Sequence, residues 1–529
     1  MATLWYGCSI YTLQEEGHLV EAVVTEGDKI IGLGSIEELE NSFNITIKHN
    51  LNGSTMFPGF VDSHIHLIGH GEKLVRLDLS SYHSKQEVLQ AVREYAMKLE
   101  DGEWVIGEGW NENQWDEPVP IVRSELDEVV PDHPVLLKRV CRHAMVVNSV
   151  ALKEASINKH SECPPGGVFG KDLDGELNGI FKENAQDLIL NAVPNPSEDY
   201  LKKALRTAIA DAHQKGLTGV HTEDLAYYNG FEDTYKLFQE VIEKEGNKLR
   251  AHLLVNHEVM NDFESAGSSF LKGSKWIEFG AIKIFTDGSL GGRTALLSHP
   301  YADDPTTNGV AIFPQNELNE LVARARELDM PVAIHAIGDL AFEMVLQAIE
   351  EHPLKGAGID RLIHAQILRL DLIERAKKLP VILDIQPSFV ASDFPWVIER
   401  VGEDHMEYCY AWKTLKEHLH CAGGSDAPVE EIAPLLGIQA AVTRTNPFDM
   451  ERVAYQPNES LSVYEAVCLY TKGSAMAACH EEDRGMIQKG FLADFTILAE
   501  NIFNIDPHDI SRIQVDRTVI GGEVVFERA

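Results

Sequence analysis

The sequence predicts an α/β protein built on a (β/α)8 TIM barrel, and three observations support this fold class. Apolar, β-branched runs begin near residues 57, 217, 250, 281, 331, 362, 381 and 420. Helical or amphipathic stretches follow most of them, for example at 317–328 and 340–351. Parallel strands need crossovers of this length, and several runs end in side chains able to bind a metal. Barrels of this kind place their chemistry at the carboxyl ends of the strands.

The first run, PGFVDSHIH at residues 58–66, ends in two histidines spaced two apart. Side chains on a strand alternate between its faces, so His64 and His66 point to the same side. Both imidazoles are therefore predicted to reach one metal ion. The pair alone is weak evidence, because a chain with 22 histidines in 529 residues produces such spacings by chance.

Four further runs carry candidate ligands at or near their carboxyl ends. His335 ends the run 330–335, His364 ends the next, and Asp426 closes the last. Lys283 stands inside an otherwise apolar run. Each of these residues also has a purely structural interpretation: a hydrogen-bonded histidine, a helix N-cap aspartate or a surface lysine. Together with the first pair, their repeated placement at strand ends favours a single metal centre.

The gap between the first and second runs is too long for one crossover. We therefore expect an inserted domain at 71–210, with its own strands at 103–107 and 134–140. The barrel then comprises 56–70 and 211–484.

The residue types in these positions indicate hydrolytic chemistry. Neutral imidazoles and carboxylates suit a borderline divalent metal, most simply Zn²⁺, in one or two ions. Such a metal polarises a carbonyl and lowers the pKa of a bound water to about 7. Asp426 is the expected proton shuttle, because it can accept a proton from water and pass it to a departing amine. The implied reaction is hydrolysis of an amide or related C–N bond.

Five motifs in this order resemble the metal-dependent amidohydrolase superfamily, and more narrowly its YtcJ-like branch (amidohydrolase family 3). They are GEGW at 107–110, RHA and VNS at 142–149, KIFTDGSLG at 283–291, HAIGD at 335–339 and GSDAP at 424–428. The resemblance implies a small β-sandwich built from both chain ends, at 1–55 and 485–529. It also implies that the insertion contributes to the substrate pocket.

The resemblance gives Lys283 a specific role. In two-metal members a lysine on the fourth strand is carboxylated and bridges the metals, which implies His64 and His66 on one ion and His335 and His364 on the other. Two alternatives stay open. Lys283 is an ordinary cation beside a single metal, paired with a carboxylate such as Asp287, or Glu183 in the insertion supplies the carboxylate instead.

Substrate contacts are predicted at four positions. Trp110 is a candidate apolar wall, with core packing as its alternative, and the same holds for Trp115. His143 is a candidate hydrogen-bond donor to a substrate carbonyl. Arg293 either binds an acidic group or caps its loop. His221, at the end of the second strand, is a candidate for orienting a metal ligand.

Composition limits the partners. With 83 acidic and 46 basic residues, the net charge of −37 disfavours nucleic acid and anionic membranes as partners. Seven scattered cysteines form no disulfide framework. Neither a signal peptide nor an 18-residue apolar run is apparent, so we expect a cytoplasmic protein with a small-molecule substrate. A homodimer is the base-rate expectation.

Three functions compete on this basis. We favour a metal-dependent hydrolase of an amide or other N-acyl or N-formyl bond. The alternative is a heterocycle deaminase with a single metal, which the presence of Lys283 disfavours. A non-enzymatic binding protein on the same barrel is a poor fit, because the full ligand set is present.

Overall fold

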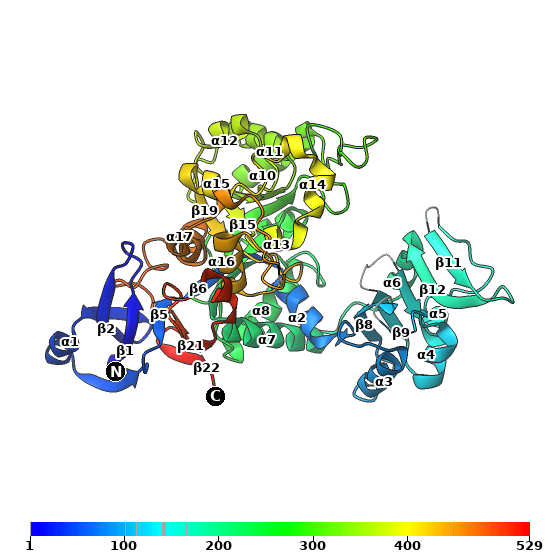
Figure 1. The fold of residues 1–529 in the computed structure, drawn as a ribbon, viewed down its shortest axis with the longest axis horizontal. Helices are drawn as coiled ribbons and strands as arrows, with labels where there is room; N and C mark the ends of the chain where they lie inside the picture. Colours follow the sequence, from blue (N-terminus) through cyan, green and yellow to red (C-terminus); the bar gives the residue numbers. More distant parts are fainter. Residues whose placement is uncertain are drawn as a thin grey trace. The chain divides into compact units, whose positions relative to one another are not determined.

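The computed structural model divides into two compact units, one formed by Met1–His70 with Ala208–Ala529 and the other by Gly71–Thr207 (Figure 1). The second unit spans nearly the same residues as the expected insertion. The structure describes the whole chain apart from residues 1, 101, 113, 114, 116, 140–143, 165, 166 and 450, and the side chains of 183 and 184.

The larger unit contains the predicted barrel. All eight predicted runs are strands of one parallel sheet, ordered β19-β18-β17-β16-β15-β14-β13-β6. Just past the ends of β6 and β19, two backbone hydrogen bonds close the sheet, from Asp426 N to His64 O and from His66 N to Ala427 O, each 2.8 Å long. The strands are β6 (Phe60–Ile65), β13 (Leu217–Thr222), β14 (Arg250–Asn256), β15 (Ile277–Phe285), β16 (Val332–Ala336), β17 (Asp360–His364), β18 (Val381–Ile385) and β19 (His420–Gly423).

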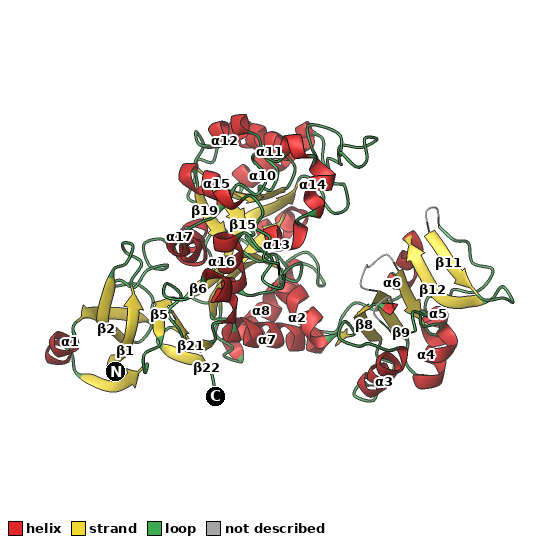
Figure 2. Cartoon of the chain, in the orientation of Figure 1, coloured by secondary structure: helices red, strands yellow, loops and turns green. Residues whose placement is uncertain are grey.

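Helices alternate with these strands along the chain (Figure 2). The amphipathic stretches predicted at 317–328 and 340–351 are α10 (Gln315–Glu327) and α11 (Asp339–Glu351). The others are α2 (Leu67–Val75), α7 (Glu198–Gln214), α8 (Phe231–Phe238), α9 (Met260–Ser265), α12 (Leu370–Ala376), α13 (Phe389–Asp393), α14 (Trp396–Val401), α15 (Trp412–His418), α16 (Pro434–Thr443), α17 (Val463–Cys468) and α18 (Ser474–Ala477).

Small and branched side chains fill the barrel interior below the strand ends. Leu254, Ala281, Ala333 and Ile363 form one buried cluster there. At the entry to β6, Gly59 allows a close approach of two strands, because a Cβ at this position would lie 2.3 Å from Oγ1 of Thr218. The start of the His64–His66 strand is thereby held against β13.

Both chain ends contribute strands to one eight-stranded sheet. A separate β-sandwich domain at 1–55 and 485–529 stays a prediction. The path is β22-β21-β20-β5-β1-β2-β3, with β4 pairing β1, and α1 (Ile36–Ser42) begins with a capping box between Ser35 and Glu38. The strands are β1 (Ala2–Tyr11), β2 (Leu19–Glu26), β3 (Lys29–Gly34), β4 (Ile45–Asn50), β5 (Thr55–Pro58), β20 (Phe495–Leu498), β21 (Val515–Ile520) and β22 (Glu523–Glu527).

The smaller unit is a six-stranded sheet of order β11-β12-β10-β9-β8-β7, with α3, α4 and α5 beside it (Figure 2). The strands predicted at 103–107 and 134–140 are β8 and β9, with slightly shifted ends. The elements are β7 (Leu77–Asp78), α3 (Lys85–Ala96), β8 (Val105–Trp110), α4 (Arg123–Val129), β9 (Val135–Arg139), β10 (Ala144–Val147), α5 (Ser149–Glu154), β11 (Gly167–Lys171), β12 (Leu177–Glu183) and α6 (Asp187–Leu190).

Two further features concern the helices and the cysteines. Among the described helices, none combines the length and apolar character that crossing a bilayer requires. The cysteines in the described part of the chain, six in number, are free thiols.

Candidate metal centre

His64 and His66 stand at the carboxyl end of β6, with ring centroids 5.6 Å apart. The His64 side chain is 1% exposed. Burial is the main cause that lowers its pKa well below the ordinary value, so the ring is neutral and keeps a nitrogen lone pair. The backbone is fixed by Asp62, whose Oδ1 accepts from the N–H groups of His64 and Ser425. The predicted pairing of the two imidazoles is therefore present in the fold.

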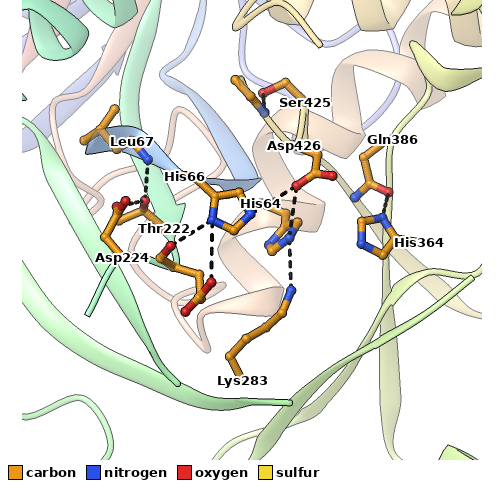
Figure 3. Close-up of polar contacts among 12 residues, drawn as sticks. His64, His66, Leu67, Thr222, Asp224, Lys283, His364, Gln386, Ser425 and Asp426 are labelled. Atoms are coloured by element: carbon orange, nitrogen blue, oxygen red, sulfur yellow. Dashed lines mark hydrogen bonds and ion pairs between the residues drawn. The ribbon is translucent and has the colours of Figure 1, made fainter. Parts of the chain in front are cut away.

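Asp426, just beyond β19, completes a three-residue group with these histidines. Its Oδ1 lies 3.4 Å from Nε2 of His64 and 3.5 Å from Nε2 of His66. The candidate ligand atoms of all three residues lie within 4.8 Å of one another. Figure 3 shows their side chains pointing toward one another, with Lys283 reaching His64. Burial opposes ionisation of Asp426, but contact with His66 and nearby positive charge outweigh it and lower its pKa.

His335 and His364, on β16 and β17, lie next to this group. Their ring centroids are 4.5 Å apart, and that of His364 is 5.6 Å from the centroid of His64. One nitrogen of each ring faces a carbonyl oxygen: Nδ1 of His364 lies 2.8 Å from Oε1 of Gln386, and Nε2 of His335 lies 3.0 Å from the backbone oxygen of Gly288. A carbonyl only accepts hydrogen bonds, so the other nitrogen of each ring carries the lone pair.

Lys283 lies on β15 and is fully buried. Its Nζ is 3.1 Å from Nε2 of His64 and 4.6 Å from the ring centroid of Phe285. Burial lowers the pKa of Lys283 to about 8. Asp287, the partner considered for it, instead accepts backbone N–H groups of residues 296, 337 and 338. The Lys283 side chain thus lies against the His64 imidazole.

The donor set fits a divalent metal. Two imidazole nitrogens and a carboxylate oxygen are ligands that a borderline ion such as Zn²⁺ accepts. Nδ1 of His64 is buried and has no hydrogen-bond partner among the described residues, whereas Nε2 of the same ring faces Asp426 and Lys283. Among the described residues, His64, His66 and Asp426 form the group of potential metal ligands whose donor atoms lie close together.

Comparisons with known proteins agree with this geometry. The family model described as "Amidohydrolase family" matches residues 49–526. The chain is 51% identical to the putative amidohydrolase YtcJ of Bacillus subtilis, over the full length of both. The chain belongs to the amidohydrolase family. Its YtcJ-like character, predicted from the motifs, is confirmed, and as a member of this family it is a hydrolase of C–N bonds.

Two further relatives of this amidohydrolase are informative. The solved structure of an uncharacterized metal-dependent hydrolase from Pyrococcus furiosus is 30% identical, with a TM-score of 0.80, covering 95% of this chain and 100% of that one. The N-substituted formamide deformylase of Arthrobacter pascens is 25% identical, covering 98% of this chain and 97% of its own length. The similarity to the Pyrococcus structure confirms the barrel fold.

Several residues that were predicted to contact substrate have other contacts in the structure. Trp110 is 3% exposed and packs with Trp115 in the core of the smaller unit, where its indole N–H donates to Leu137 O at 3.3 Å. The core-packing alternative accounts for both tryptophans. Arg293 is held by Asp303 through two hydrogen bonds of 3.1 and 2.7 Å, as a loop-capping residue would be. His143 and the side chain of Glu183 lie outside the described residues.

His221 does not contact the ligand histidines in the described structure. Its ring packs against that of His252, with centroids 4.8 Å apart, and both line a cavity of about 30 Å³ together with residues from the amino ends of the strands. These contacts differ from the predicted one with a metal ligand. The reason is that inward-facing residues of one strand occupy different layers of a barrel, and His221 lies one layer below the ligands.

Two polar neighbours of the ligands were missed. Gln386 directly follows β18 and contacts His364, and Glu223 directly follows β13 and contacts His66. Both occupy the same strand-end position that identified the ligands. A search of every strand end for carboxylates and amides, and not only for histidines, would have found them.

Proposed function

We propose that this protein hydrolyses an N-acyl or N-formyl type C–N bond of a small molecule with a metal-activated water. The observation that carries the proposal is the convergence of His64, His66 and Asp426, whose candidate ligand atoms lie within 4.8 Å of one another at the carboxyl end of the barrel. These three buried or half-buried side chains come from two strands that are distant in the sequence. Three protein ligands are typical of a catalytic metal site, which keeps a position open for water or substrate, rather than of a closed structural site.

The residues divide naturally between two ions, with Zn²⁺ as the favoured metal. His64, His66 and Asp426 would hold the first, and His335 and His364 would hold the second. Lys283 would contribute as a carboxylated lysine, formed when its uncharged amine adds to carbon dioxide and releases a proton. Its burial and its 3.1 Å contact with His64 support this role, because an ammonium at this position would repel a metal cation.

When bound, a divalent metal polarises the substrate carbonyl and supplies a water of lowered pKa. Asp426 does the proton chemistry. Its lowered pKa keeps it as a carboxylate at neutral pH, ready to accept a proton from the attacking water. The same carboxyl group then donates that proton to the departing amine nitrogen. His64 and His66 lie against its Oδ1 and fix its orientation.

The relatives support the bond class. The Bacillus subtilis protein is named a putative amidohydrolase, and the Arthrobacter pascens protein an N-substituted formamide deformylase. Both names point to C–N bonds next to a carbonyl, and the second points to a formyl group.

A single-metal heterocycle deaminase is the second candidate. It is favoured by the fact that His335 and His364 do not join the tight three-residue group found among the described side chains. In that case Lys283 is a buried cation and the second pair of histidines is free for substrate.

Metal content per chain, measured by elemental analysis after purification with bicarbonate, tests the proposal. Two equivalents, followed by hydrolysis in a screen of N-formyl and N-acyl amines, are the expected result. One equivalent with ammonia release from heterocyclic amines would select the deaminase. If the purified wild-type protein holds no metal but binds it on reconstitution, the screen is repeated with added Zn²⁺. If the protein binds no metal under either condition, the proposed centre is refuted.

A further inference from the structure

Glu223 lies beside the metal centre without belonging to the proposed ligands. It follows β13, which pairs with β6 so that Thr222 lies opposite Ile65. The N–H of Glu223 donates to Ile65 O at 3.0 Å, continuing this pairing past the strand end. The register therefore places Glu223 next to His66. Its side chain is fully buried.

Two oxygens of Glu223 face the same nitrogen of His66. The backbone oxygen lies 2.9 Å from Nδ1, and the carboxylate Oε2 lies 3.5 Å from it. The other carboxylate oxygen, Oε1, accepts a hydrogen bond of 3.0 Å from Nδ2 of Asn256. Asn256 is itself fixed, because its Oδ1 accepts from the N–H of Glu258 at 2.9 Å. Glu223 is thus held from one side and presents Oε2 to the imidazole on the other.

We propose that Glu223 is a positioning residue that fixes the His66 ring for metal binding and strengthens it as a ligand. With the Nδ1 proton committed to Glu223, the lone pair of His66 is on Nε2, which faces Oδ1 of Asp426. A carboxylate beside the far nitrogen of a ligating histidine increases the basicity of the nitrogen that binds the metal. The inference rests on the proposed metal-dependent function.

The carboxylate of Glu223 is buried beside the candidate ligands. Its Oε2 lies 3.5 Å from Nδ1 of His66, and burial together with the charge of this carboxylate and a hydrogen bond to it raises the pKa of the Tyr227 hydroxyl. A buried carboxylate costs stability in the metal-free protein, and a nearby divalent cation offsets the cost. His364, in contrast, is oriented by the neutral amide of Gln386. Glu223 therefore adds a negative charge on the side of the centre formed by His64, His66 and Asp426.

The test compares Glu223→Gln with Glu258→Gln, which makes the same change at an exposed glutamate. Zn²⁺ affinity is measured by chelator competition on the metal-free full-length chain, together with thermal unfolding of the same metal-free samples. We expect Glu223→Gln to bind Zn²⁺ about 10- to 100-fold more weakly. Its metal-free melting temperature should be unchanged or higher, and Glu258→Gln should match wild type in both measurements.

Other results overturn the inference in distinguishable ways. Unchanged Zn²⁺ affinity in Glu223→Gln, with or without a lower metal-free melting temperature, shows that Glu223 has only a structural role and leaves the proposed function standing. Failure of wild type itself to bind Zn²⁺, Mn²⁺ or Fe²⁺ overturns both the inference and the proposed function.

Discussion

Replacing Asp426 with asparagine separates metal binding from proton transfer. The two side chains have nearly the same shape, so the substitution introduces no steric clash. An amide oxygen can still face His64 and His66, whose Nε2 atoms lie 3.4 and 3.5 Å from Oδ1 in the native protein. The amide cannot accept and return a proton. We therefore expect Asp426→Asn to keep its metal and lose most of its turnover.

The size of the loss follows from the role of the residue. A positioned general acid–base group contributes about 10²- to 10⁴-fold to the rate. At about 1.36 kcal/mol for each factor of ten, this corresponds to a barrier higher by roughly 3–5 kcal/mol. Asp426 acts in both halves of the proposed reaction and is buried from competing solvent, so we expect the upper part of this range.

The assay is kcat on the best N-formyl or N-acyl substrate, with metal content measured on the same sample. Asp371→Asn, an exposed aspartate on α12, is the matched control and should retain full turnover. Undiminished turnover of Asp426→Asn at full metal occupancy would remove Asp426 as the proton shuttle. Loss of metal together with turnover would show that it acts chiefly as a ligand.

Three other perturbations have defined outcomes. His64→Ala or His335→Ala should abolish binding at its metal position while circular dichroism shows a native fold; full metal content in both would refute the centre. Lys283→Ala should lose one metal equivalent and recover activity partly with short-chain carboxylic acids, whereas unchanged metal content would refute the bridge. Glu278→Gln should destabilise the barrel by about 3–5 kcal/mol, because it removes the negative charge that faces Nε2 of His480 at 2.9 Å in a buried pair. Against the opposing effect of burial, contacts with imidazoles lower the pKa of Glu278 from its ordinary 4.5, and contacts with carboxylates raise that of His480 from 6.5. The stabilisation from the Glu278 carboxylate is thus lost as pH falls below 4.5, and that from the protonated His480 is lost as pH rises above 6.5. The melting temperatures of wild type and Glu278→Gln should therefore differ most between these two pH values. A difference that does not depend on pH would contradict this.

Much of the barrel was predictable because its strands are locally encoded. Each begins with an apolar, β-branched run and ends near a polar residue, and this pattern needs no knowledge of distant neighbours. The candidate ligands were predicted by the same rule, since the carboxyl ends of parallel strands meet at one end of a barrel. His221 shows the limit of the rule, because a strand-end histidine can face a lower layer of the interior.

The number and order of the barrel strands, the types of metal ligand and the amidohydrolase motifs can all be read from the sequence. Which side chains touch one another is set by the tertiary fold. Glu223 meets His66 across 157 residues of chain, Trp110 lies in a core and Arg293 pairs with Asp303. These contacts depend on how the barrel closes and how loops pack against it. Local periodicity predicts neither the closure of the barrel nor the packing of its loops, because both depend on contacts between residues of different elements.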